Sequence, residues 1–78
     1  MISLGEFDGY TLTVNQSNVE PDKVTYHLYK GGEERGYCRE DSIDSVFGPS
    51  VDDYLYVEAA KRYEALGRPD AGGFTGEV

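Results

Sequence analysis

A chain of 78 residues is long enough for one domain and no more. Its 15 acidic and 7 basic side chains give a net charge of −8. A field of this sign repels nucleic acid and anionic membranes and attracts basic protein surfaces. A core of this size holds one sheet and one or two helices. It leaves little room for a deep, water-excluding pocket, which argues against an enzyme.

Solubility, or adaptation to a salt-rich cell, would also produce an acidic chain of this kind. Cys38 is the only cysteine, so no intramolecular disulfide can form and nothing suggests an oxidising compartment. The first six residues lack the basic and apolar segments of a signal peptide, and no apolar run approaches membrane-spanning length. The sequence therefore predicts a soluble, cytoplasmic protein.

Three segments read as strands. Residues 10–14 alternate apolar and polar side chains, residues 24–30 are rich in β-branched and aromatic types, and residues 35–39 follow as a third strand. Residues 31–34, Gly-Gly-Glu-Glu, are predicted to connect the last two strands as a hairpin loop. Residues 5–9 lead into the first strand, with residues 2–4 as an extension at the edge.

The pattern then changes to helical. Ser42 can cap a short turn, and Ser50 is a favourable N-cap for a helix over residues 51–66. Gly67 is a natural residue just after that helix, and Pro69 blocks its continuation. Residues 70–78 show no periodic pattern and are expected to form a flexible tail.

The predicted fold is therefore α+β. A three-stranded antiparallel β-meander is followed by a short helical turn and one long C-terminal helix, which packs on one face of the sheet. Residues 1–69 form the single domain. The predicted core joins side chains of the three strands to one helix stripe: Leu12, Val14, Val24, Tyr26, Leu28, Cys38, Leu55, Ala59 and Leu66, with Val51 on the same stripe and Tyr63 at its edge.

No residue pattern indicates catalysis, a metal or a cofactor. His27 is the only histidine, and a tetrahedral zinc site needs four ligands with paired short spacings. His27 is expected on the face opposite Tyr26, half-exposed, and Cys38 as a small core residue. Adjacent carboxylates on solvated turns do not provide the cleft that an acid–base pair requires.

Two aromatic features are candidates for a binding surface. Tyr29 and Tyr37 should point away from the core, and tyrosine is enriched at interfaces; ordinary cross-strand packing is the alternative. Tyr54, Val57 and Lys61 form a second helix stripe, roughly opposite Leu55. Val57 should pack against a terminal segment of the chain or face a partner.

The acidic residues cluster along the predicted elements. Two lie at the tip of the hairpin, three lie between sheet and helices, and two open the long helix. Together they can form an anionic track similar to the charge row of a nucleic-acid backbone. The predicted partner-binding residues are Glu33, Glu34, Glu40, Asp41, Asp44, Asp52 and Asp53, with Tyr29 and Tyr37 as anchors.

In size, acidity and aromatic content the whole chain resembles small phage or mobile-element inhibitors, including DNA-mimicking anti-CRISPR proteins. The resemblance carries no site residues with it. It implies a protein of the host cytoplasm that competes with DNA or RNA for the basic surface of a nucleic-acid-binding protein. The resemblance and the acidity lead to the same expectation, an inhibitor or regulator that is a monomer or weak homodimer. The alternative is a small structural or assembly subunit that acts through self-association.

Overall fold

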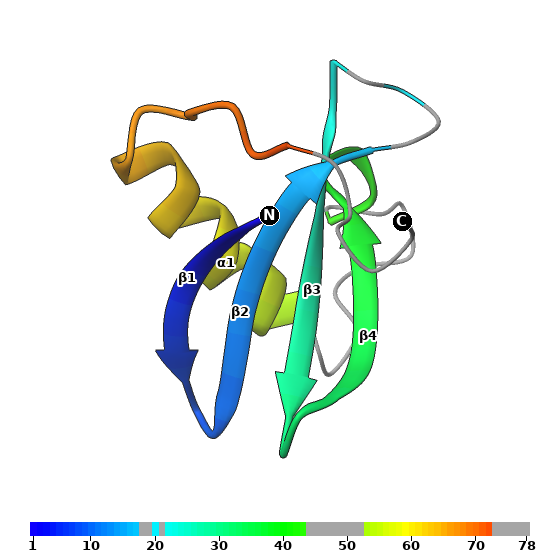
Figure 1. Ribbon diagram of the computed structural model, residues 1–78, viewed down its shortest axis with the longest axis vertical. Coiled ribbons are helices and arrows are strands. Elements are labelled where there is room, and N and C mark those ends of the chain that lie inside the picture. The colour runs from blue at the N-terminus through cyan, green and yellow to red at the C-terminus, as the bar shows by residue number, and fades with distance from the viewer. Residues whose placement is uncertain (18–19, 21, 44–52, 73–78) are drawn as a thin grey trace.

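The computed structural model describes residues 1–17, 20, 22–43 and 53–72. Four strands form an antiparallel sheet in the order β1-β2-β3-β4, so that each strand pairs with its neighbour in the sequence (Figure 1). The strands are β1 (Ile2–Phe7), β2 (Tyr10–Gln16), β3 (Val24–Lys30) and β4 (Glu33–Arg39). A 3-10 turn, η1 (Glu40–Ser42), and one helix, α1 (Asp53–Ala65), complete these elements.

The prediction of a three-stranded sheet was wrong, because β1 is a strand of its own. Its pairing with β2 shifts between Ser3 and Gly5, and Gly5 has a φ of +91°. This bulge interrupts the alternation by which a strand is recognised. Asp8 and Gly9 then form a two-residue turn with φ of 53° and 86°, the backbone that Asp-Gly favours in hairpins.

The second hairpin turn is shorter than predicted. Gly31 and Gly32 have φ of 62° and 85° and turn the chain by themselves. Glu33 and Glu34 therefore belong to β4 rather than to a loop, and they pair with Lys30 and Tyr29 of β3. The two hairpin turns lie at the same end of the sheet (Figure 1).

The helix is shorter than the long helix that was predicted over residues 51–66. α1 has 13 residues, and residues 51 and 52 lie outside the described part of the chain, as does the predicted cap Ser50. The prediction that Gly67 follows the end of the helix is confirmed. Gly67 has a φ of 84°, and its N–H donates to the Glu64 carbonyl. The Arg68 N–H donates to the Tyr63 carbonyl, which completes a Schellman motif.

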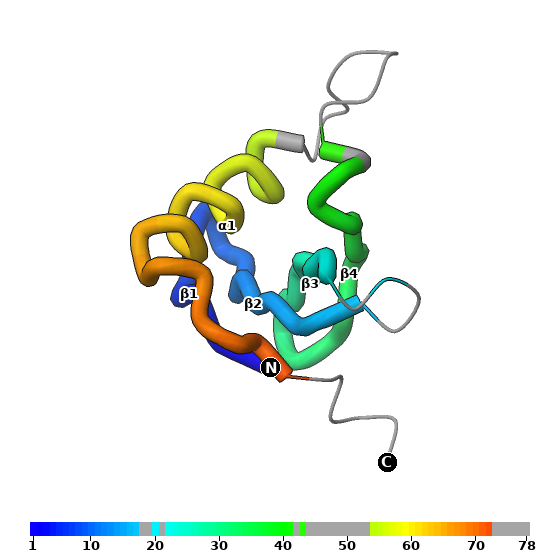
Figure 2. Tube along the Cα trace, turned by 90° about the horizontal axis from the view of Figure 1, so that it is seen from above, coloured from blue at the N-terminus to red at the C-terminus, as the bar shows by residue number. Residues whose placement is uncertain are grey.

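The core lies between α1 and one face of the sheet. α1 packs against β1, β2 and β3, on the far side of the sheet in Figure 1 and along one edge of the molecule in Figure 2. Most of the predicted core is confirmed as buried, and Cys38 packs against it half-buried. The fully buried large side chains are Tyr26, Tyr63, Leu12, Leu28, Leu55, Val14 and Val24.

Leu66 does not join the core. It is 56% exposed because the helix ends one residue before it and the chain turns away at Gly67. Tyr63 takes the central place instead, with its ring edge-on to Tyr26 at 6.3 Å between centroids. Tyr56 is also buried, and its hydroxyl lies 2.7 Å from where a Cβ on Gly36 would be. Any larger residue at position 36 of β4 would therefore force the Tyr56 ring to shift.

Two further contacts join distant parts of the chain. One guanidinium nitrogen of Arg62 donates to the carbonyls of Leu4 and Glu6, at 3.0 Å each, which fastens α1 to the edge of β1. The Gln16 N–H donates to the Gly72 carbonyl at 2.7 Å, next to the buried Ala71. Within the described ranges no helix is long and apolar enough to cross a membrane.

Truncating Leu55 should destabilise the protein far more than truncating Val57. Leu55→Ala leaves a cavity at a position that is 1% exposed and should cost about 2–5 kcal/mol. Val57 is 37% exposed, so Val57→Ala should cost less than about 1 kcal/mol. Urea unfolding of both variants measures the difference. Equal midpoint shifts would contradict this orientation of α1.

Candidate functional site

The face of the sheet opposite α1 is polar, and we call it the polar face. It is turned toward the viewer in Figure 1. Pairing of β2 with β3 and of β3 with β4 places its side chains in rows across the sheet. The polar face comprises Thr11, Thr13, Asn15, Thr25, His27, Tyr29, Glu34, Tyr37 and Arg39.

An aromatic cluster occupies the β3–β4 part of the polar face. His27 lies between Tyr29 and Tyr37, with ring centroids 6.4 Å and 6.1 Å away. Its Nδ1 lies 3.3 Å from a carboxylate oxygen of Glu34. The prediction of a half-exposed His27 was wrong: its side is as predicted, but these neighbours and its central strand leave it 8% exposed.

The two predicted anchors differ in exposure. Tyr37, on the edge strand β4, is 71% exposed. Tyr29, on the inner strand β3, is half-buried, and burial followed by the Glu34 carboxylate raises the pKa of its hydroxyl. Tyr37 is thus a large amphipathic ring on the surface, the kind of side chain that anchors protein interfaces.

The predicted acidic track is separated into groups in the structure. Glu33 and Glu34 lie at the hairpin end of β4, close to the aromatic cluster. Glu40 and Asp41 lie in η1, at the opposite end of β4 (Figure 1). Asp53 is the first residue of α1, whereas Asp44 and Asp52 lie outside the described residues.

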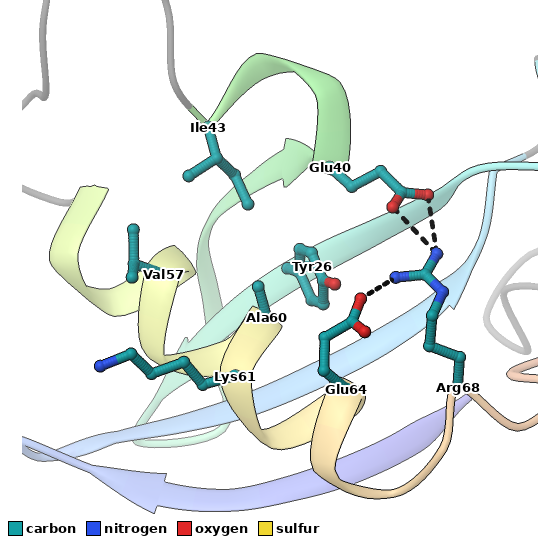
Figure 3. A pocket seen from close by; sticks show the side chains of 8 residues that line it. All are labelled: Tyr26, Glu40, Ile43, Val57, Ala60, Lys61, Glu64 and Arg68. Carbon is teal, nitrogen blue, oxygen red and sulfur yellow. Dashed lines mark hydrogen bonds and ion pairs between the residues drawn. The ribbon is translucent and has the colours of Figure 1, made fainter.

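Glu40 is held inside an ion-pair network. Arg68 donates to Glu40 at 2.9 Å and to Glu64 at 2.6 Å, which links η1 to the end of α1 (Figure 3). The other oxygen of Glu40 accepts the Val24 N–H at 2.8 Å. Both carboxylates raise the pKa of the Arg68 guanidinium. This arrangement makes Glu40 an architectural residue.

Asp41 has a similar role on the surface. The Nε of Arg39 donates to it at 2.8 Å, and this hydrogen bond lowers the pKa of the Asp41 carboxyl. Arg39 also reaches Glu20, at 3.3 Å. Of the predicted binding residues, the structure brings Glu34, Tyr29 and Tyr37 together on the polar face, whereas Glu33 pairs with Lys30 at the tip of the same hairpin. Arg68 and Arg39 were missed, although Glu64 and Asp41 lie close to them in sequence; their other partners, Glu40 and Glu20, are 28 and 19 residues away.

Most of the positive charge is already paired. Five of the seven basic side chains lie within 4.0 Å of a carboxylate: Lys23, Arg35, Arg39, Arg62 and Arg68. Lys30 lies over the ring of Tyr10, at 5.1 Å. The described residues include no group of three or more histidine, cysteine or acidic side chains that could hold a metal ion.

No protein-family model, curated protein or solved structure matches this chain.

The buried Tyr26 hydroxyl should make the fold sensitive to alkali. Burial, followed by the Glu40 carboxylate, raises the pKa of Tyr26 to about 12, against about 10 in an unfolded chain. As the pH rises, the Tyr26 hydroxyl therefore loses its proton in the unfolded state first. Its contribution to the free energy of unfolding is complete below pH ~10 and is lost toward pH ~12. Its size is on the order of 2 kcal/mol.

Urea unfolding at about pH 9 and about pH 11.5 tests this expectation, with Tyr26→Phe as the matched variant. The loss of stability between the two pH values should be smaller in Tyr26→Phe than in the wild type. Tyr29 and Tyr63, whose pKa values are also raised by burial, contribute to the remaining loss. Identical losses in both proteins would show that Tyr26 ionises as freely in the folded state as in the unfolded state.

Proposed function

We propose that this protein inhibits or regulates a nucleic-acid-binding protein by occupying that protein's basic surface. The observation that carries the proposal is the exposed ring of Tyr37 on the polar face, where Tyr37 and Glu34 both lie against His27, with Glu33 in the same hairpin. An exposed aromatic anchor with carboxylates at its margin fits a surface on which arginine and lysine normally hold phosphates.

The distribution of charge supports a partner whose surface is positively charged. The chain has fifteen acidic and seven basic residues, and five of the seven basic residues form ion pairs within the fold. The cations are thus scattered and neutralised in place. A protein that binds nucleic acid needs a cluster of free cations. A protein that binds a basic surface needs exposed carboxylates instead.

The mechanism is steric and electrostatic competition. The side chain of Glu33 is 75% exposed, and its carboxylate lies 3.9 Å from Arg35. In this loose surface pair a partner's guanidinium can replace Arg35. Glu34 is turned inward to His27 and mainly holds the aromatic cluster in place. Exposed charges of this type act on the rate of association and lose effect as salt rises.

The partner can be isolated with the chain itself as bait. Wild type and Tyr37→Ala are immobilised in parallel, and proteins of the native host retained by the wild type alone are identified by mass spectrometry. Each is then tested for binding to its own nucleic acid in the presence of this protein. A retained protein that binds nucleic acid and this chain simultaneously, each at unchanged affinity, would sink the proposal.

Tyr37→Ala should weaken binding to that partner by about 2 kcal/mol or more, because it removes the central anchor. Leu66→Ala is the matched control, since Leu66 is exposed and apolar but lies at the far end of α1. Titration calorimetry measures both. Folding should be unaffected by either change, which circular dichroism checks. An equal effect of the two variants on affinity would remove Tyr37 from the interface.

Glu33→Gln should lower the association rate several-fold at low salt and have little effect at high salt. It is a cleaner charge variant than Glu34→Gln, which would also break the contact with His27. Asp22→Asn removes one charge from the loop at the other end of the sheet and should leave the rate nearly unchanged. Surface plasmon resonance at two salt concentrations measures the association rates of both variants. Equal changes in rate would show that only the net charge of the protein matters.

A further inference from the structure

A groove lies between α1 and η1, on the side of the core away from β1. Its volume is about 500 Å³, within the range of small-molecule sites. Tyr26 of β3 forms its floor, side chains of α1 form one wall and Ile43 forms the other (Figure 3). Neither the charge distribution nor the aromatic cluster of the polar face explains this groove.

A buried polar group faces into the groove. Tyr26 is 1% exposed, yet its hydroxyl lines the cavity and forms no hydrogen bond with the residues that the structure describes. Its neighbours Glu40, Glu64 and Arg68 bond to one another instead. A hydroxyl in this position can donate a hydrogen bond to an oxygen of a bound group, and such a bond contributes net stability to binding.

The walls add an apolar body and one free charge. Ile43, Val57 and Ala60 line the cavity with aliphatic groups, and Val57 is 37% exposed although it is apolar. Lys61 lies at the rim, and its ammonium has no carboxylate within 4.0 Å among the described residues. Arg68, at the other end, is saturated by two carboxylates.

We propose that this groove binds a small amphipathic carboxylate. The carboxylate pairs with Lys61, the apolar body lies between Val57 and Ile43, and an oxygen at the far end accepts the hydrogen bond of Tyr26. The local charge allows this, because Lys61 and Arg68 offset Glu40 and Glu64. Repulsion from the more distant acidic residues is screened within about 8–10 Å at physiological salt. The site is independent of the proposed contact through Tyr37.

Three probes of one shape test the assignment in the full chain. 4-Hydroxyphenylacetate carries both polar ends, 4-methylphenylacetate lacks the far oxygen, and tyramine replaces the carboxylate by an ammonium. Titration followed by amide chemical shifts should place 4-hydroxyphenylacetate in the groove, with shifts at Val57, Lys61 and Ile43. It should bind more tightly than both other probes. Equal or tighter binding of tyramine would overturn the proposal.

Variants separate the two polar contacts. Lys61→Gln should weaken 4-hydroxyphenylacetate about two- to five-fold, the range of an exposed ion pair, and should remove its advantage over tyramine. Tyr26→Phe should weaken it about two- to ten-fold and remove its advantage over 4-methylphenylacetate. Lys30→Gln removes a charge outside the groove and should change nothing.

Two further outcomes would overturn the assignment. The first is unchanged affinity in both Lys61→Gln and Tyr26→Phe. The second is a set of groove shifts that depends on protein concentration before any probe is added, because a second copy of the chain would then occupy the groove. Binding of the macromolecular partner through Tyr37 is measured separately, so failure of either proposal leaves the other open to its own test.

Discussion

One helix has to cover the apolar face of four strands, and the rest of the structure follows from this constraint. Strands about 4.8 Å apart make the face wider than a helix, which is about 10 Å across. α1 lies over β1, β2 and β3, and η1, which follows β4, also contacts β3. Arg68 bridges the space between α1 and η1 at one end, and the groove lies beside that bridge.

Two arginines hold this cover in place from its two sides. Arg62 donates to carbonyls of β1, and Arg68 joins the end of α1 to Glu40. These positive charges are thereby engaged in contacts within the fold, whereas the surplus negative charge lies at the surface. The acidity of the surface and the attachment of α1 to the sheet are therefore linked, because Arg62 and Arg68 are engaged in that attachment.

The sequence predicted those parts of the fold that depend on local pattern. The two inner strands, the end of the helix at Gly67 and most of the core are as expected. The first strand was missed because a bulge at Gly5 breaks its alternation, although Asp8-Gly9 is a hairpin signal that could have indicated it. A glycine that leads into a strand and a glycine inside a bulged strand look alike in sequence.

The candidate site was predictable only in part, for a similar reason. Alternation along β3 and β4 placed Tyr29 and Tyr37 on one face, because side-chain direction in a strand is local. Glu40, in contrast, pairs with Arg68, 28 residues away, and no spacing rule connects the two. Whether a carboxylate is free to meet a partner depends on such tertiary pairs, and composition alone does not give them.

The meander order of the sheet also bears on how the chain reaches this structure. Every strand pairs with its neighbour in sequence, and two-residue turns join both outer hairpins. Contacts between sequence neighbours close short loops at low entropic cost and favour rapid folding. Docking of α1 and the pairing of Arg68 with Glu40 join more distant segments. Nucleation in the hairpins, followed by attachment of the helix, is the order that this topology favours.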